Sequence, residues 1–232
     1  MKTISQILSA ELNQPEAYIQ NVIALLDEGN TIPFIARYRK EAHGAMDDTT
    51  LRALETRLQY LKNLQARRDE VKSSIESQGK LTDELSAAID EAATLAEVED
   101  LYRPYKQKRR TRATVAREKG LEPLAEAIFA QTRGMAAPDV LAQDYLDAEK
   151  GVETVADALQ GANDILAEQF SDDAEIRKSL RGLMQKRAAA CSKASDPDAD
   201  SVYRLYYEFS QPVAKLQSHQ VLALNRGEKE GF

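Results

Sequence analysis

The feature that most constrains the fold is a stripe of apolar residues in the first third of the chain. Its members recur every three or four positions: Leu51, Leu54, Leu58, Leu61, Leu64, Val71 and Ile75. This spacing places side chains on one face of an α-helix. Asp47 is a typical N-cap and Gly79 a typical stop, so we expect a helix of roughly 30 residues, about 45 Å long. Because such a helix is stable only when its apolar face is covered, the chain must supply packing partners.

The segment after this helix offers one partner. It begins with Thr82 and two acidic residues, which is typical of a helix start. Its apolar residues again share one face: Leu85, Ala88, Ile89 and Ala92. We therefore predict an antiparallel helical hairpin over residues 46–102, with its turn at residues 78–80.

Helical spacing also marks the rest of the chain. Three short helices are expected in residues 1–45, and Pro33 suits the first turn of the third. Asp172 and Glu175 form a capping pattern for a helix that runs to about Ala190. The sequence predicts an all-α fold made of a short-helix unit at 1–45, the long hairpin at 46–102, a basic connector at 103–112, a second helical bundle at 113–195 and a linker at 196–232.

The composition excludes several classes of protein. The single cysteine, Cys191, allows neither an internal disulfide framework nor a multi-thiolate metal site, so a reducing compartment, the cytoplasm, is expected. No run of about 18 apolar residues is present, so we expect no membrane contact.

No pattern predicts catalysis or a bound cofactor. His43 and His219 lie 176 positions apart, and neither has cysteine or carboxylate neighbours at metal-ligand spacing. Glycine-rich phosphate-binding loops are absent from the sequence. Paired carboxylates such as Asp47 and Asp48 stand at helix starts, where acids serve as caps. We predict no catalytic residue, no metal site and no cofactor, and a protein that is not an enzyme.

A basic segment is the most distinctive chemical feature of the sequence. The whole chain carries a net charge of -7, yet residues 103–119 hold a single acid, Glu118. Their cations are Arg103, Lys106, Lys108, Arg109, Arg110, Arg112, Arg117 and Lys119. Lys and Arg neutralise phosphates, and Tyr102 and Tyr105 could stack on bases, so the segment is a candidate nucleic-acid contact. The alternative stays open: these cations could pair with carboxylates of the acidic second half or only solvate a loop.

Two weaker candidates stand elsewhere in the sequence. Arg37, Arg39 and Lys40, on the third short helix, could form a second nucleic-acid contact, and a solvated helix face is the simpler interpretation. An aromatic cluster follows Asp200 and consists of Tyr203, Tyr206, Tyr207 and Phe209. Aromatic residues at helical spacing usually pack in a core or interface, so we interpret this cluster as packing.

Several short sequence motifs resemble those of a known family and occur in the same order. They are TIPFIARYRKE at 31–41, the paired acids Asp47 and Asp48, SI at 74–75, QGKLT at 78–82, EDLYRPYK at 99–106, KRRTRA at 108–113, ARE at 116–118, GLEPLA at 120–125, and SH at 218–219 followed by LALNRGE at 222–228. These motifs resemble the amino-terminal region of the bacterial Tex proteins over essentially the whole chain. A departure occurs at His43–Met46, where the family usually reads Thr-Gly-Gly-Leu.

The resemblance implies a role in transcription and nucleic-acid binding, because Tex proteins are transcription accessory factors. In the family, the helical region, expected here at 1–195, is followed by an RNase H-like domain, helix-hairpin-helix motifs and an OB-type RNA-binding domain. These do not fit in 232 residues, so residues 196–232 are expected to lead toward a missing RNase H-like domain. No catalytic residue is carried over from the family.

The leading hypothesis is therefore an amino-terminal helical module of a transcription accessory protein. It would bind RNA or DNA weakly through Arg103 to Arg117 and help to place the missing domains. The alternative is a protein-interaction scaffold that contacts RNA polymerase or the protein's own missing domains and does not itself bind nucleic acid.

Overall fold

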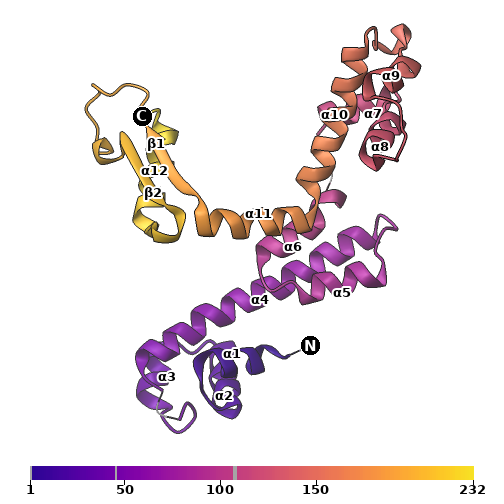
Figure 1. Cartoon of the computed structure of the whole chain (residues 1–232). Helices are drawn as coiled ribbons and strands as arrows, with labels where there is room; N and C mark the ends of the chain where they lie inside the picture. The colour runs from indigo at the N-terminus through magenta and orange to yellow at the C-terminus, as the bar shows by residue number, and fades with distance from the viewer. Residues whose placement is uncertain (1, 45, 107–108) are drawn as a thin grey trace. The chain divides into compact units, whose positions relative to one another are not determined.

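The computed structural model describes residues 2–44, 46–106 and 109–232. The described part of the chain forms twelve α-helices, several short 3-10 turns and one sheet of two strands, which confirms the predicted all-α class (Figure 1). The chain divides into two compact units, residues 1–106 and 107–232, and each is described by itself. No helix among the described residues is both long and apolar enough to span a membrane.

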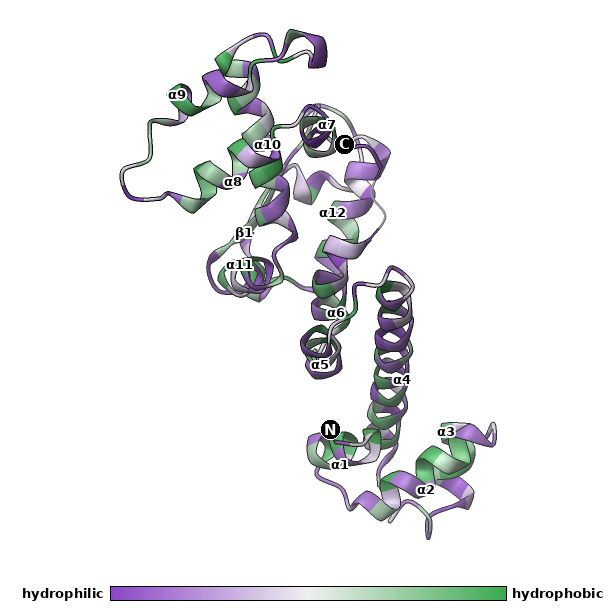
Figure 2. Cartoon of the chain, turned by 90° about the vertical axis from the view of Figure 1, so that its right-hand side faces the viewer, coloured by the Kyte–Doolittle hydropathy of each residue, from purple (hydrophilic) through white to green (hydrophobic). Residues whose placement is uncertain are grey.

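The first unit is built around one long helix. Its helices are α1 (Ile4–Leu12), α2 (Glu16–Asp27), α3 (Ile32–Tyr38), α4 (Asp48–Glu76), α5 (Asp83–Glu91) and α6 (Leu95–Tyr102), and the 3-10 turn Arg103–Tyr105 follows. The long helix, α4, has 29 residues, and its predicted cap is present: the Asp47 carboxylate accepts a hydrogen bond of 2.7 Å from the amide of Thr50. Green and purple residues alternate along α4 in Figure 2, as expected of an amphipathic helix.

The predicted stripe on α4 is the centre of the first hydrophobic core. All seven of its members are buried, each with at most 6% of its surface exposed. Helices α1, α3, α5 and α6 all pack against α4. The predicted hairpin partner is divided in two, because Thr94 caps a new helix, α6, by exchanging hydrogen bonds with Glu97. The long helix is therefore covered by several short helices rather than by one long partner.

Buried His43 is unusual in this core. Its side chain is only 2% exposed, and neither Nδ1 nor Nε2 has a hydrogen-bond partner among the described residues. A buried polar atom without a partner destabilises the folded state by roughly 1–3 kcal/mol. This cost is the reason to expect that an apolar side chain would suit the position better.

We expect His43→Leu to raise the free energy of unfolding by about 1 kcal/mol, because it removes both unpaired nitrogens and keeps a similar volume. Thermal unfolding followed by circular dichroism measures the change. His219→Leu, at the exposed position in α12, is the matched control and should leave stability nearly unchanged. A lower stability of His43→Leu would contradict the prediction.

The second unit contains a helical bundle and a small hairpin. Its elements are α7 (Arg112–Glu118), α8 (Glu122–Ala130), α9 (Pro138–Ala142), α10 (Val155–Asp172), α11 (Ala174–Arg187), β1 (Ala189–Lys193), β2 (Glu208–Pro212) and α12 (Ser218–Glu230). Helices α7, α8 and α9 pack against α10. Gly161 lets α7 approach α10 closely, because a Cβ atom there would lie 2.3 Å from Leu121 Cδ1 and 3.3 Å from Ala116 Cβ.

The strand pair differs from the sequence prediction. A helix was expected to run to about Ala190, but α11 ends at Arg187 and β1 pairs antiparallel with β2, with Ala189 opposite Pro212 and Lys193 opposite Glu208. The signal is weak in the sequence because β1 has no β-branched or aromatic residue and its partner lies about twenty positions away. The division of the chain into the five predicted segments stays a prediction.

Candidate nucleic-acid interface

The predicted basic segment is divided between the two units. Arg103 and Lys106 belong to the first unit, and Arg109 and the cations after it belong to the second. Lys108 lies outside the described residues. Lys106 and Arg109 are exposed, and neither forms an ion pair with another described residue. Within the second unit, the described cations of the segment gather before and along α7.

The start of α7 is fixed by Thr111. Its hydroxyl oxygen caps the helix by accepting from the Thr114 amide at 3.1 Å, and the hydroxyl donates to the carboxylate of Glu168 on α10 at 3.0 Å. Ala113 and Ala116, each 3% exposed, face the core of the second unit. This packing holds α7 against α10.

Arg117, a predicted nucleic-acid contact, helps to hold α7 against its neighbouring helices. Its guanidinium donates to Glu168 at 2.7 Å and to Glu122 at 3.2 Å, and its side chain is 35% exposed. The hydrogen bond with Glu168 raises the pKa of the Arg117 guanidinium above its usual value. Both of its carboxylate partners belong to other helices, as the scaffold alternative expects.

Arg110 and Arg112 are more accessible to a ligand than Arg117. Arg110 lies 2.6 Å from Glu118, with both side chains more than half exposed. The side chain of Arg112 is 87% exposed and lies 3.9 Å from Asp164. Ion pairs between exposed side chains contribute roughly 0–1 kcal/mol, so a phosphate can replace Glu118 as the partner of Arg110 at small cost.

These two arginines border a groove of about 400 Å³ between α7 and α10, which we call the α7–α10 groove. Its lining residues are Arg110, Thr111, Arg112, Val115, Ala116, Lys119, Leu121, Asp157, Gln160, Gly161 and Asp164. Lys119 already donates to the carbonyl oxygen of Gly151 at 2.7 Å. The α10 residues were not candidates in the sequence, because nothing local indicates that a segment more than forty positions away packs beside Arg112.

The second predicted contact lies in the first unit, where α3 ends. Arg37, Arg39 and Lys40 are all exposed. The guanidinium of Arg39 lies 5.4 Å from the ring centre of Phe34 and donates to the carbonyl oxygen of Tyr38 at 3.3 Å. Of the three residues only Arg37 lies within α3, because the helix ends at Tyr38 and not beyond Lys40 as expected, and these contacts hold Arg39 against the end of that helix.

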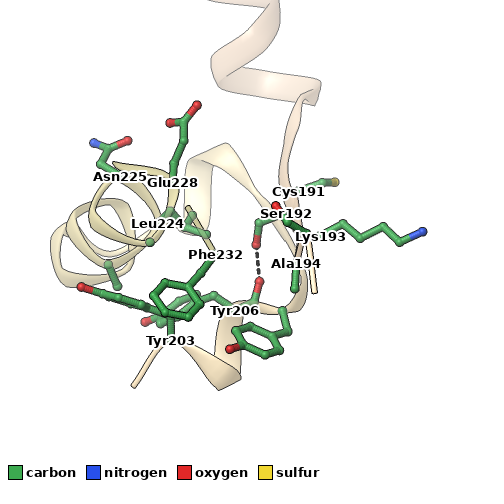
Figure 3. Close-up of a pocket in the computed structure, with 14 residues that line it drawn as sticks. Cys191, Ser192, Lys193, Ala194, Tyr203, Tyr206, Leu224, Asn225, Glu228 and Phe232 are labelled. Carbon is green, nitrogen blue, oxygen red and sulfur yellow. Dashed lines mark hydrogen bonds between the residues drawn. The ribbon is translucent and has the colours of Figure 1, made fainter. Parts of the chain in front are cut away.

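Three members of the aromatic cluster, Tyr203, Tyr206 and Tyr207, line a cavity of about 410 Å³ near the end of the chain (Figure 3). The ring of Tyr203 lies 5.9 Å from that of Phe232, and Tyr206 lies 5.3 Å from Phe209. Tyr203 also donates from its hydroxyl to Glu230 at 2.8 Å. The rings pack against neighbours within the unit, which agrees with the packing interpretation.

The described residues contain no group of three or more His, Cys, Asp and Glu side chains placed to bind a metal ion.

Comparison with known proteins identifies relatives over nearly the whole chain. The protein named YdcI of Bacillus subtilis is 47% identical over 98% of this chain and 32% of its own length. The transcriptional accessory protein Tex of Neisseria gonorrhoeae is 44% identical over 98% of this chain and 30% of its own length. The human S1 RNA-binding domain-containing protein 1 is 31% identical over 96% of this chain and 23% of its own length. The chain thus spans about a third of the length of its bacterial relatives.

Two family models match the chain, and together they cover most of it. Residues 2–76 match the Tex-like protein N-terminal domain. Residues 134–232 match the Tex central region-like family, which includes the strand pair and α12. The resemblance of the sequence motifs is therefore confirmed, and the chain belongs to the Tex family.

Proposed function

We propose that this chain is a nucleic-acid-binding helical module that acts in transcription, and that the cations before and at the start of α7 contact phosphates. The observation that carries the proposal is the exposure of Arg110 and Arg112 at the edge of the α7–α10 groove. Arg109, in the same segment, is exposed as well. Lysine and arginine side chains that reach phosphates supply most of the sequence-independent affinity for nucleic acid.

Family membership supports the same function. The Neisseria relative is named a transcriptional accessory protein, and the human relative is named for an S1 RNA-binding domain. Neither name describes an enzyme. We accordingly infer that the chain acts in transcription in the cytoplasm and that RNA or DNA is its partner.

A salt titration tests the proposed contact. A fluorescent single-stranded RNA and a DNA duplex of matched length are bound to the chain at several salt concentrations. We expect the logarithm of the affinity to fall with the logarithm of salt concentration by about 0.7–0.9 units for each phosphate contacted. The triple variant Arg109→Ala, Arg110→Ala, Arg112→Ala should flatten the slope by about one unit for each arginine that contacts a phosphate.

The matched control removes the same charge elsewhere in the second unit. Arg133, Lys186 and Lys215 are exposed and lie outside the basic segment. Their joint replacement by Ala should leave the salt slope unchanged. An equal change in slope for both triple variants would show a general charge effect and would overturn the assigned contact.

A scaffold function is the second candidate, and α11 favours it. Four apolar side chains on this helix are between 37% and 58% exposed: Ile176, Leu180, Leu183 and Met184. Ile176 and Leu180 are four positions apart, and Leu183 and Met184 lie three and four positions after Leu180, so the four side chains share one face of the helix. Exposed apolar surface of this kind often marks a protein interface. If the intact chain binds neither nucleic acid even at low salt, the scaffold function replaces the first proposal.

A further inference from the structure

The α7–α10 groove combines three kinds of chemistry within about 400 Å³. Arginine side chains stand on the α7 side, and two carboxylates, Asp157 and Asp164, stand on the α10 side. Apolar side chains between them form the floor, where Ala116 and Leu121 are at most 3% exposed. Small-ligand sites usually have this composition, with an apolar lining and a few convergent polar groups.

The two carboxylates have different roles. Asp157 belongs to the cap of α10, because it accepts hydrogen bonds from the amide and the hydroxyl of Thr154 at 3.0 and 2.7 Å. These bonds hold the pKa of Asp157 below its usual value. Asp164 accepts one hydrogen bond of 3.1 Å from Gln160 and lies 3.9 Å from Arg112. With its side chain only 18% exposed, Asp164 keeps acceptor capacity that the described contacts do not fill.

A carboxylate in this position is unfavourable for a phosphate alone, because like charges repel. It is favourable for a ligand that carries a phosphate at one end and a hydrogen-bond donor at the other. A nucleotide with an exocyclic amino group has both, since cytosine presents N4 and adenine N6 as donors. In a duplex one hydrogen of each amino group still points into the major groove, but the base itself is stacked and cannot enter the groove, so only an unpaired strand can place a base here.

Resting on the nucleic-acid function proposed above, we propose that the α7–α10 groove seats one nucleotide of a single strand. Its phosphate lies against Arg110 and Arg112, its base covers the apolar floor beside Val115, and its exocyclic amino group donates to Asp164. The groove volume falls within the 300–1,000 Å³ range of small-ligand sites. Asp164 is then the residue that distinguishes a base-bearing strand from a bare phosphate backbone.

The test compares two probes and two variants by fluorescence anisotropy. The probes are a labelled oligocytidine RNA and an abasic strand of equal length. The variants are Asp164→Ala and the matched control Glu126→Ala, which removes the same charge from an exposed position on α8 outside the groove. We expect Asp164→Ala to bind oligocytidine about tenfold more weakly than wild type, because a hydrogen bond to a charged group is lost.

The abasic strand gives the opposite expectation. The abasic strand has no base that could donate to Asp164, so Asp164→Ala only removes a negative charge and should strengthen the binding of this strand. The control Glu126→Ala should strengthen the binding of both probes slightly. Ala is a good helix former, and circular dichroism confirms that both variants keep their helical content. If Asp164→Ala weakens the binding of oligocytidine and strengthens that of the abasic strand, the groove binds a nucleotide base as proposed; we call this site the nucleotide seat.

The possible failures are distinguishable. If Asp164→Ala strengthens the binding of both probes, the nucleotide seat is overturned and the electrostatic function of the basic segment stands. If the wild-type chain binds neither probe at low salt, the proposed function and the nucleotide seat are overturned together.

Discussion

Replacement of Leu54 by Ala is expected to lower the free energy of unfolding by about 2–5 kcal/mol. Leu54 has 0% exposure at the centre of the α4 stripe, where the helix is covered by its short neighbours. The shorter side chain loses burial energy and leaves a cavity that the packed helices can fill only in part. Urea unfolding followed by circular dichroism measures the loss, and hydrogen exchange should show reduced protection along α4.

The matched control for Leu54→Ala is Glu55→Ala, the next position on the same helix, which is exposed. Both variants introduce the same good helix former, so they differ mainly in the burial of what is removed. Glu55→Ala should change stability by less than about 0.5 kcal/mol. Equal effects of the two variants would show that the α4 stripe does not carry the first core.

Replacement of Arg117 by Met is expected to lower the free energy of unfolding by roughly 1–3 kcal/mol. Met keeps the apolar packing of the arginine stem but has no donor for Glu168 or Glu122. Glu168 has a side chain only 16% exposed, so the loss of its arginine partner leaves a largely buried charge less well compensated. Urea unfolding measures the effect, and Arg133→Met at an exposed position is the control.

The same Arg117→Met variant separates the structural role of this residue from nucleic-acid binding. Because Arg117 is held by two carboxylates, we expect the salt slope of RNA binding to stay as in the wild-type chain. A slope flatter by about one unit would instead place Arg117 among the phosphate contacts. Unchanged stability would contradict the packing role.

Local sequence patterns predicted the helices well, for a physical reason. The spacing of Leu51, Leu54 and their successors depends only on the periodicity of one helix, and caps such as Asp47 act on amides three residues away. The family motifs are also local, and they identify the Tex family without reference to any tertiary contact. Features of this kind can be read from one segment at a time.

Tertiary structure decided which cations are available and what lies beside them. Arg112 and Arg117 look alike in the sequence, yet one is 87% exposed and the other is paired with Glu168, fifty-one positions away. The β1–β2 pair, the burial of His43 and the α7–α10 groove depend in the same way on segments that are distant in the chain. The sequence by itself determined the helical class, the long helix and the family. Only packing between distant segments decided how the basic residues are used, because ion pairs and grooves depend on partners that no local pattern specifies.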